Sequence, residues 1–150
     1  MSHALQRTDA KQAERQTLTM EIPDWVPSSV LSLNGRRRAH WTTIRAYQEQ
    51  AKWKLSEALR VGIGWRGIPW AAGEFGQVPP LKARVSIDFV YPRRRRRDPD
   101  GLAGLCKPLL DTLVFEGVLL DDDSEHIELS VRAVVERGIM ATRIKIEEME

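Results

Sequence analysis

The sequence predicts an α+β domain in which two main helices pack on a mixed sheet of about four strands. Three patterns support this fold class. Residues 81–91 alternate apolar and polar side chains, as a half-buried strand does. Apolar residues recur at three- and four-residue steps through residues 44–58, and again from residue 102, as on the buried face of a helix. Two further strand-like segments, residues 127–136 and 139–147, close the chain.

Length and composition indicate a single globular domain. The chain has 150 residues, of which 42% are apolar and 29% charged, enough for one hydrophobic core. No segment approaches the ~20 apolar residues that span a membrane, and the polar start, MSHALQRTDAKQAERQ, does not resemble a secretory signal. The single cysteine, Cys106, leaves no internal disulfide and no cysteine-based zinc cluster. We therefore expect an intracellular protein.

The first half of the chain predicts a tail, a strand and a helix. Residues 1–16 are polar and aperiodic, and we expect them to form a disordered tail before a domain of residues 17–150. The segment TLTMEI, residues 17–22, predicts the first strand. A helix is expected to follow, capped by Thr42 or Thr43. Its buried stripe would consist of Ile44, Tyr47, Ala51, Leu55 and Ala58.

A loop and the clearest strand come next. Residues 61–80 contain five glycines, three prolines and two tryptophans, which predicts a long irregular loop. The strand at residues 81–91 then follows. One face of it is expected to carry Leu81, Ala83, Val85, Ile87 and Phe89.

The last third predicts a helix, an acidic turn and two strands. The helix covers about residues 102–115, and Pro108 inside it removes a hydrogen bond and favours a kink. Three aspartates, residues 121–123, follow in a short loop, and the two final strands are joined by a tight turn at Arg137 and Gly138. The apolar stripe of the helix would be Leu102, Leu105, Cys106, Leu109 and Leu113.

Charge is divided unevenly along the chain. Residues 1–97 carry 18 Lys and Arg against 8 Asp and Glu, whereas residues 98–150 carry 5 against 13. The sign changes inside RRRRRDPDG, residues 93–101. A basic half favours a polyanionic partner held through phosphates. An acidic half would repel that partner, unless some carboxylates hold a cation between themselves and the phosphates.

The exposed face of the last helix carries the candidate chemistry. At 100° per residue, Asp100, Gly104, Lys107 and Asp111 fall within about 60° of one another, opposite the apolar stripe. Asp98 lies two residues earlier, so in an extended segment it points the same way as Asp100. The later aspartate turn could return to this face. Converging carboxylates need a cation, and hard oxygen ligands suit Mg²⁺ or Mn²⁺.

Each of these features also has a simpler interpretation. An arginine run is usually a solvated loop, and two aspartates before a helix usually form a cap and a dipole partner. Lys107 and Asp111 have the spacing of an ordinary surface ion pair, and the three aspartates could form a polar turn. Cys106 is expected to be a core residue. The combination within one short segment favours a metal-dependent site for phosphodiester hydrolysis.

The segment RRRRRDPDGLAGLCKPLLDTLVFEGVLLDDDSEHI resembles the core of the RusA family of Holliday-junction resolvases, particularly its phage-borne members. That family shows an arginine-rich run, D-x-D-N, a downstream lysine, D-x-L, a glycine turn and Asp-Asp, followed by two strands. LNGRRRAHW resembles its N-terminal part, so the similarity covers about residues 30–147. Gly101 stands where the family usually has Asn, and the spacing from D-x-D to Lys is the longer one of the phage-type members.

The resemblance implies a homodimeric, Mg²⁺-dependent enzyme that cuts four-way DNA junctions by paired symmetric nicks during DNA recombination and repair. It would act in the cytoplasm of a bacterium or a phage-infected cell, with Mn²⁺ as a possible substitute metal. The residues that match the family's catalytic positions are Asp98, Asp100, Lys107 and Asp122. Metal binding is assigned by the same resemblance to Asp98, Asp100, Asp122 and Asp121, with Asp111 as an accessory residue.

A basic surface is expected to bind the DNA backbone. Its residues would be Arg36, Arg37, Arg38, His40, Arg93, Arg94, Arg95, Arg96 and Arg97. Three alternatives remain at this point. The chain could be a non-catalytic, structure-selective DNA-binding protein, a nuclease for other branched or flapped DNA, or an RNA- or ribosome-associated basic protein that needs no metal.

Overall fold

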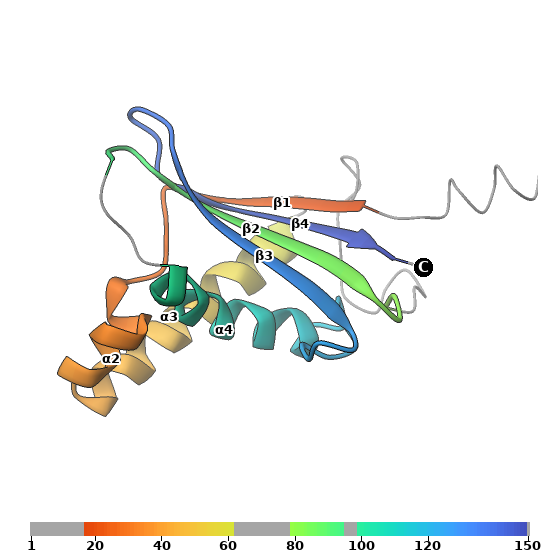
Figure 1. Cartoon of the computed structure of the whole chain (residues 1–150), viewed down its shortest axis with the longest axis horizontal. Helices are drawn as coiled ribbons and strands as arrows, with labels where there is room; N and C mark the ends of the chain where they lie inside the picture. The colour runs from red at the N-terminus through yellow and green to blue at the C-terminus, as the bar shows by residue number, and fades with distance from the viewer. Residues whose placement is uncertain (1–16, 62–78, 95–98, 150) are drawn as a thin grey trace, which may run out of the picture.

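The computed structural model describes residues 17–61, 79–94 and 99–149. In these ranges the chain forms an α+β domain with a four-stranded mixed sheet and three α-helices, which confirms the predicted fold class (Figure 1). The helices lie on one face of the sheet. The expected tail, residues 1–16, and most of the expected loop, residues 62–78, fall outside the described residues.

The sheet has the order β1-β4-β2-β3. Its strands are β1 (Thr17–Pro23), β2 (Ala83–Tyr91), β3 (Ile127–Val135) and β4 (Ala141–Glu148). β4 runs antiparallel to both of its neighbours, whereas β2 and β3 are parallel. Parallel neighbours need a crossover connection, and α4 (Pro99–Phe115) supplies it.

The two final strands do not pair with each other, although a tight turn joins them. Gly138 adopts a positive φ of 79°, and the Ile139 N–H donates to the Glu136 carbonyl at 3.0 Å. Such a turn is typical of a hairpin. Here the Glu136 N–H instead donates to the Tyr91 carbonyl at 3.1 Å, so the end of β3 stays on β2. β2 therefore lies between β3 and β4, an arrangement that the turn sequence did not predict.

The apolar residues of β2 form the centre of the core. Ala83, Val85, Ile87 and Phe89 are fully buried, as the alternation predicts. Leu81 was wrongly placed on this face: it precedes the strand and is 80% exposed. The alternating sequence pattern begins at Leu81, but the paired strand begins only at Ala83. The prediction therefore started the strand two residues too early.

The long helix α3 (Trp41–Val61) packs its predicted stripe against the core. The predicted caps were wrong, because Thr42 and Thr43 lie inside its first turn. His40 occupies the capping position instead: its Nδ1 accepts the Thr42 N–H at 3.2 Å, and its carbonyl accepts the Thr43 N–H at 3.0 Å. The first amide groups of a helix need an acceptor, and an imidazole nitrogen supplies it here.

A short helix, α2 (Leu33–Arg38), forms where no helix was expected. It follows a 3₁₀ turn, η1 (Ser29–Leu31), and Ser32 caps it by accepting the Gly35 N–H at 3.1 Å. The two turns approach so closely that a Cβ on Gly35 would lie 2.3 Å from the Ser29 carbonyl oxygen. The glycine in LNGRRR is therefore needed for packing.

The crossover helix begins at Pro99, three residues earlier than predicted, and runs without a break through Pro108. Proline is favoured at the first helical position because its missing N–H has no partner there in any case. The five predicted stripe residues are all buried. No helix in the described ranges is both long and apolar enough to cross a membrane.

Candidate active site

Lys107 is the centre of the candidate site. It lies on the exposed side of α4, and its Nζ is 2.6 Å from Asp122 Oδ2 and 3.0 Å from Asp111 Oδ1. Asp111 is one helical turn further along α4, as the spacing predicts. Asp122 comes from the turn between α4 and β3, 15 residues away in the sequence. The structure thus brings together three of the predicted site residues.

The end of α4 explains why the acidic turn returns to Lys107. Gly117 takes a positive φ of 78°, and the Val118 N–H donates back to the Leu113 carbonyl at 2.9 Å. A left-handed glycine with such a reversed bond is a common way to end a helix. Val118 and Leu119 then enter the core, each 2% exposed. This apolar anchor holds the aspartates that follow beside the helix.

Both members of the Lys107–Asp122 pair are charged at neutral pH. The hydrogen bond to Asp122, followed by that to Asp111, raises the pKa of Lys107 above its ordinary value of 10.5. In turn, the hydrogen bond from Lys107 lowers the pKa of Asp122 below its ordinary 3.8. Lys107 is therefore a fixed cation and not a general base at neutral pH. A fixed cation of this kind can stabilise negative charge that develops on a phosphate.

A second cluster lies on the same turn. One ligand atom each from Asp121, Asp123 and His126 lies within 4.8 Å of the others. Asp123 Oδ1 accepts the backbone N–H groups of Glu125 and His126, both at 3.0 Å, and lies 2.5 Å from His126 Nδ1. Asp121 Oδ1 accepts the Asp122 N–H at 2.7 Å. These bonds shape the turn, so the cluster has a structural role whether or not it binds an ion.

His126 was missing from the predicted site. The hydrogen bond between the two side chains raises the pKa of His126 and lowers that of Asp123. The signal in the sequence was the three-residue spacing of Asp123 and His126, which is typical of an aspartate that closes a turn. A carboxylate and an imidazole at this spacing can also share a metal ion.

The predicted metal site is only partly within the described residues. Asp98 lies outside them, and Asp100 is described only by its place in the first turn of α4. Asp100 precedes Lys107 by seven residues, so the two positions share a face of the helix, about 10 Å apart along its axis. Carboxylate oxygens from Asp121 and Asp123 fit Mg²⁺, and the nitrogen of His126 in the same cluster would shift the preference toward Mn²⁺. The donor chemistry therefore fits a divalent cation.

Arg36, which we expected to bind DNA, makes internal bonds. Its Nε donates to the Leu31 carbonyl at 3.0 Å, and its Nη2 donates to the Gly104 carbonyl at 3.4 Å. In a regular helix the N–H four residues later would bond to Gly104, but that residue is Pro108, which has none. Arg36 thus supplies the donor that the proline lacks, and it ties the α2 segment to α4.

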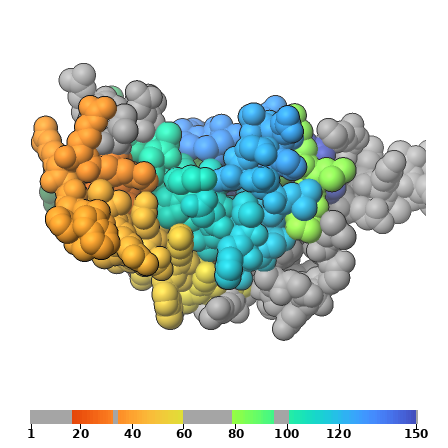
Figure 2. All heavy atoms as spheres, turned by 90° about the horizontal axis from the view of Figure 1, so that it is seen from below, coloured from red at the N-terminus to blue at the C-terminus, as the bar shows by residue number. Residues whose placement is uncertain are grey.

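The other predicted basic residues differ from Arg36 in exposure. Arg37 and Arg38 of α2 are exposed, as are Arg93 and Arg94 beyond the end of β2. His40 is also exposed, with its ring 2.7 Å from Thr42 Oγ1. Arg95, Arg96 and Arg97 lie outside the described residues. The segment α2 packs against α4, and Arg36 in it bonds Gly104, which lies one turn before Lys107. The space-filling view shows the region of α2 beside that of α4 (Figure 2).

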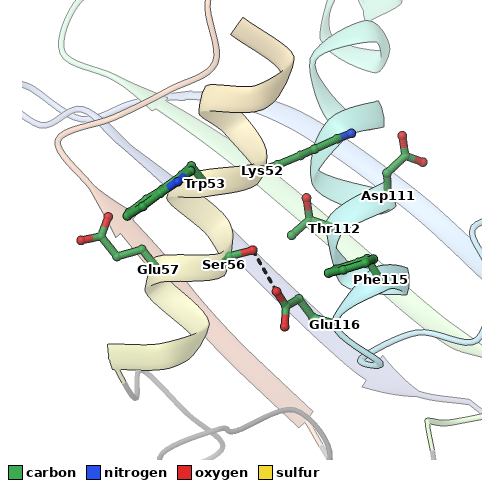
Figure 3. Close-up of a pocket in the computed structure, with 8 residues that line it drawn as sticks. All are labelled: Lys52, Trp53, Ser56, Glu57, Asp111, Thr112, Phe115 and Glu116. Atoms are coloured by element: carbon green, nitrogen blue, oxygen red, sulfur yellow. Dashed lines mark hydrogen bonds between the residues drawn. The ribbon is translucent and has the colours of Figure 1, made fainter. Parts of the chain in front are cut away.

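A groove of about 820 Å³ opens between α3 and α4 (Figure 3). Lys52 extends across it from α3 toward α4, and Ser56 Oγ donates to Glu116 Oε1 at 3.0 Å. Asp111 belongs both to this groove and to the Lys107 site. The lining residues are Lys52, Trp53, Ser56, Glu57, Asp111, Thr112, Phe115 and Glu116.

Cys106 is a core residue, as the apolar stripe predicts. It is fully buried, and its thiol donates to the Leu102 carbonyl at 3.4 Å. Burial raises the pKa of this thiol to about 12. A protonated, buried thiol cannot act as a nucleophile, so the candidate chemistry is that of the carboxylates and Lys107.

The sequence matches no protein-family model, and no curated protein matches it. The resemblance of residues 93–127 to the RusA pattern therefore stays a prediction. Any functional conclusion depends on the geometry around Lys107.

Proposed function

We propose that the chain is a divalent-metal-dependent endonuclease of the RusA type, which resolves four-way DNA junctions by paired nicks and acts as a homodimer. One observation carries the proposal: Lys107 Nζ lies 2.6 Å from Asp122 Oδ2. These two positions match the lysine and the later aspartate of the RusA pattern that the sequence resembles. Their contact is made across the turn that follows α4, and it supports a shared role.

Lys107 and Asp122 would have different roles in the hydrolysis of a phosphodiester. The ammonium of Lys107 would stabilise the charge that develops on the phosphoryl oxygens. The hydrogen bond to Asp122 raises the pKa of that ammonium and fixes its position. A divalent ion held by Asp121, Asp122 and the D-x-D carboxylates would polarise a phosphoryl oxygen and lower the pKa of an attacking water.

The exposed arginines carry the positive charge that binding to the phosphates of the DNA backbone requires. Arg37 and Arg38 are exposed on α2, a helix that packs against α4, and Arg93 and Arg94 lie beyond the end of β2. Contacts of this kind are made to phosphates, so they fix orientation without reading sequence. Binding should weaken steeply as the salt concentration rises.

The test is cleavage of an end-labelled synthetic four-way junction, compared with linear duplex and flap substrates, in Mg²⁺ or in EDTA. We expect symmetric paired nicks on the junction with Mg²⁺ and none with EDTA. Junction binding without cleavage in either Mg²⁺ or Mn²⁺ would overturn the nuclease proposal. Faster cleavage of the flap than of the junction would keep the chemistry but change the substrate.

A non-catalytic junction-binding protein is the second candidate. The mutual contacts of Lys107, Asp111 and Asp122 favour it, because these charges satisfy one another without a metal. Asp100→Asn separates the two candidates. For a nuclease, this variant keeps or improves junction binding and loses cleavage. For a binding protein, the wild type and the variant bind alike and neither cuts.

A further inference from the structure

The two edge strands of the sheet differ in how far their helix-facing side chains are buried. At the β1 edge, the side chains that face the helices, Leu18, Met20 and Ile22, are at most 3% exposed. At the β3 edge, Leu129 is 41% and Val135 48% exposed, although their register partners on β2 lie on the helix-facing side. Seen from the helix side, atoms of the β3 region remain uncovered beside α4 (Figure 2).

The outer edge of β3 is also open for pairing. In the ranges that the structure describes, β2 is the only strand that pairs with β3. A nine-residue edge strand presents a row of backbone donors and acceptors, and such an edge readily pairs with another strand. The β3 edge thus combines an open backbone with an apolar row that the helices leave uncovered.

The other face of the sheet carries rows of alternating charge. One row crosses all four strands in register and ends on β3 with a positive charge. Its members are Glu21, Arg143, Asp88 and Arg132. Arg132 donates two hydrogen bonds to Asp88, at 3.0 and 2.7 Å.

A second row lies four residues away and has the opposite order. It ends on β3 with a negative charge. Its members are Glu147, Arg84 and Glu128, and Arg84 Nε lies 3.5 Å from Glu128 Oε2. The β3 edge therefore presents one positive and one negative end, placed symmetrically about Ser130.

We propose that this edge pairs with a second copy of the chain, with the two β3 strands antiparallel and a two-fold axis at Ser130. Arg132 of one copy then lies opposite Glu128 of the other, and the symmetric contact forms at the same time. Each charge row continues into the second copy with its signs still alternating. On the helix side, Leu129 of one copy meets Val131 of the other, which covers the middle of the apolar row.

The charges favour this register over the other registers in which two antiparallel β3 strands could pair. A slip of one residue would move the apolar row to the polar face, so only even shifts keep the two faces in place. A two-fold axis at Arg132 would set Arg132 opposite itself and Glu128 opposite Glu136. Like charges directly opposite each other destabilise a sheet. With the axis at Leu129 or Val131, the contact between Arg132 and Glu128 is lost.

The same arrangement brings opposite charges together at the ends of the paired strands. The register places the end of β3 in one copy, at Val135, next to the start of β3 in the other, which follows the turn that contains Asp123. Val135 pairs with Tyr91 at the end of β2, shortly before Arg93. The arginine-bearing end of one copy thus lies near the acidic turn of the other. The dimer would join the two candidate sites, but its existence does not depend on nuclease activity.

Charge reversal tests the contact. Arg132→Glu and Glu128→Arg each place like charges opposite each other twice in a homodimer, so each variant alone should dissociate at least about tenfold more readily than the wild type. In an equimolar mixture the two variants are complementary, and a heterodimer should form. Sedimentation or light scattering would give a mass of twice the 17.1 kDa chain for the wild type and for the mixture.

Every outcome of this experiment decides the proposal. It is overturned if the wild type is a monomer, if the single variants dimerise as the wild type does, or if mixing fails to restore the dimer. Circular dichroism of each variant shows that it is folded. These measurements involve no DNA or metal, so a failed interface and a failed nuclease proposal are distinguishable.

Disulfide trapping supplies an independent test that tolerates small losses of stability. Ser130→Cys places two thiols at the proposed two-fold axis and should give a cross-linked dimer under mild oxidation. The matched control is Thr19→Cys, which is exposed on the same face at the opposite edge strand. Cross-linking of the Thr19 variant and not of the Ser130 variant would assign the interface to β1. Cys106 is buried and should not compete.

Discussion

Asp122 and Asp123 are neighbours in the sequence with opposite roles in the structure. Asp122 reaches across to α4 and contacts Lys107, whereas Asp123 turns back on its own loop and bonds His126. The first contact joins two elements of the fold, and the second shapes only the turn. Identical residue types at adjacent positions can therefore differ in function, because the backbone of the turn points them in different directions.

Arg36 and Arg37 are also neighbours of the same residue type with different roles. Arg36 bonds the carbonyls of Leu31 and Gly104, whereas Arg37 is exposed to solvent. One arginine holds α2 against α4, and the next is available to a phosphate. In both comparisons two neighbouring residues are identical in type. One of them makes contacts that hold the fold together, and the other can act on a ligand.

Lys107→Met should have the largest effect. We expect cleavage to fall about 10²- to 10³-fold, because the fixed positive charge at the scissile phosphate is lost. Thermal stability should change little, since the side chain is largely exposed. The measurement is single-turnover cleavage of a four-way junction, with Lys54→Met on α3 as the control. Wild-type rates in the Lys107 variant would contradict the proposed role.

Asp122→Asn and Asp123→Asn test the comparison directly. We expect the Asp122 variant to lose cleavage roughly 10²-fold with little loss of stability. The Asp123 variant should instead unfold at a lower temperature and keep most of its activity, because it loses the contacts that close the turn. Cleavage rates and thermal melts of both variants separate the two roles. An inactive but fully stable Asp123 variant would make Asp121, Asp123 and His126 the metal site.

Arg36→Ala should destabilise the fold by about 1 kcal/mol, because the Gly104 carbonyl loses its donor. Arg37→Ala should leave the melting temperature unchanged and weaken DNA binding. In a Pro108→Ala background the Arg36 substitution should cost less, because the alanine backbone supplies the N–H that the proline lacks. Denaturant unfolding of the two single variants and the double variant measures this coupling. Strict additivity would contradict the link between Arg36 and Pro108.

Changes of pH should weaken the two ion pairs in different ranges. His126 has a raised pKa, so its contribution to stability is complete below pH 6.5 and is lost as the pH rises through the raised pKa. Asp123 has a lowered pKa, so its contribution is complete above pH 3.8 and is lost as the pH falls through the lowered pKa. The contact between them is strongest between these limits.

Lys107 and Asp122 should keep their contact over a wider range. The raised pKa of Lys107 preserves its contribution up to at least pH 10.5, and the lowered pKa of Asp122 preserves its own down to pH 3.8. In EDTA, the difference in melting temperature between the wild type and His126→Gln should shrink above pH 6.5. The difference for Asp122→Asn should stay nearly constant from about pH 5 to pH 9. Parallel pH profiles would contradict this assignment.

The sequence by itself determined the local elements. Alternation in β2 and the apolar stripes of α3 and α4 follow from the periods of strands and helices, which each segment carries without reference to the rest of the chain. The spacing of Lys107 and Asp111 on α4 is local in the same sense. Errors at this level were confined to element ends, as at Leu81 and at the start of α3, and to the short helix α2.

Only the tertiary structure determined which strands, helices and side chains are neighbours. The tight turn at Gly138 could not show that β2 separates β3 from β4, because strand order depends on the packing of the whole sheet. Arg36 could not be distinguished from Arg37 until α2 packed against the carbonyl that Pro108 leaves without a donor. Asp122 was distinguished from Asp123 only by its contact with Lys107, 15 residues away in the sequence. In each case the deciding contact joins residues far apart in the chain, which no local period encodes.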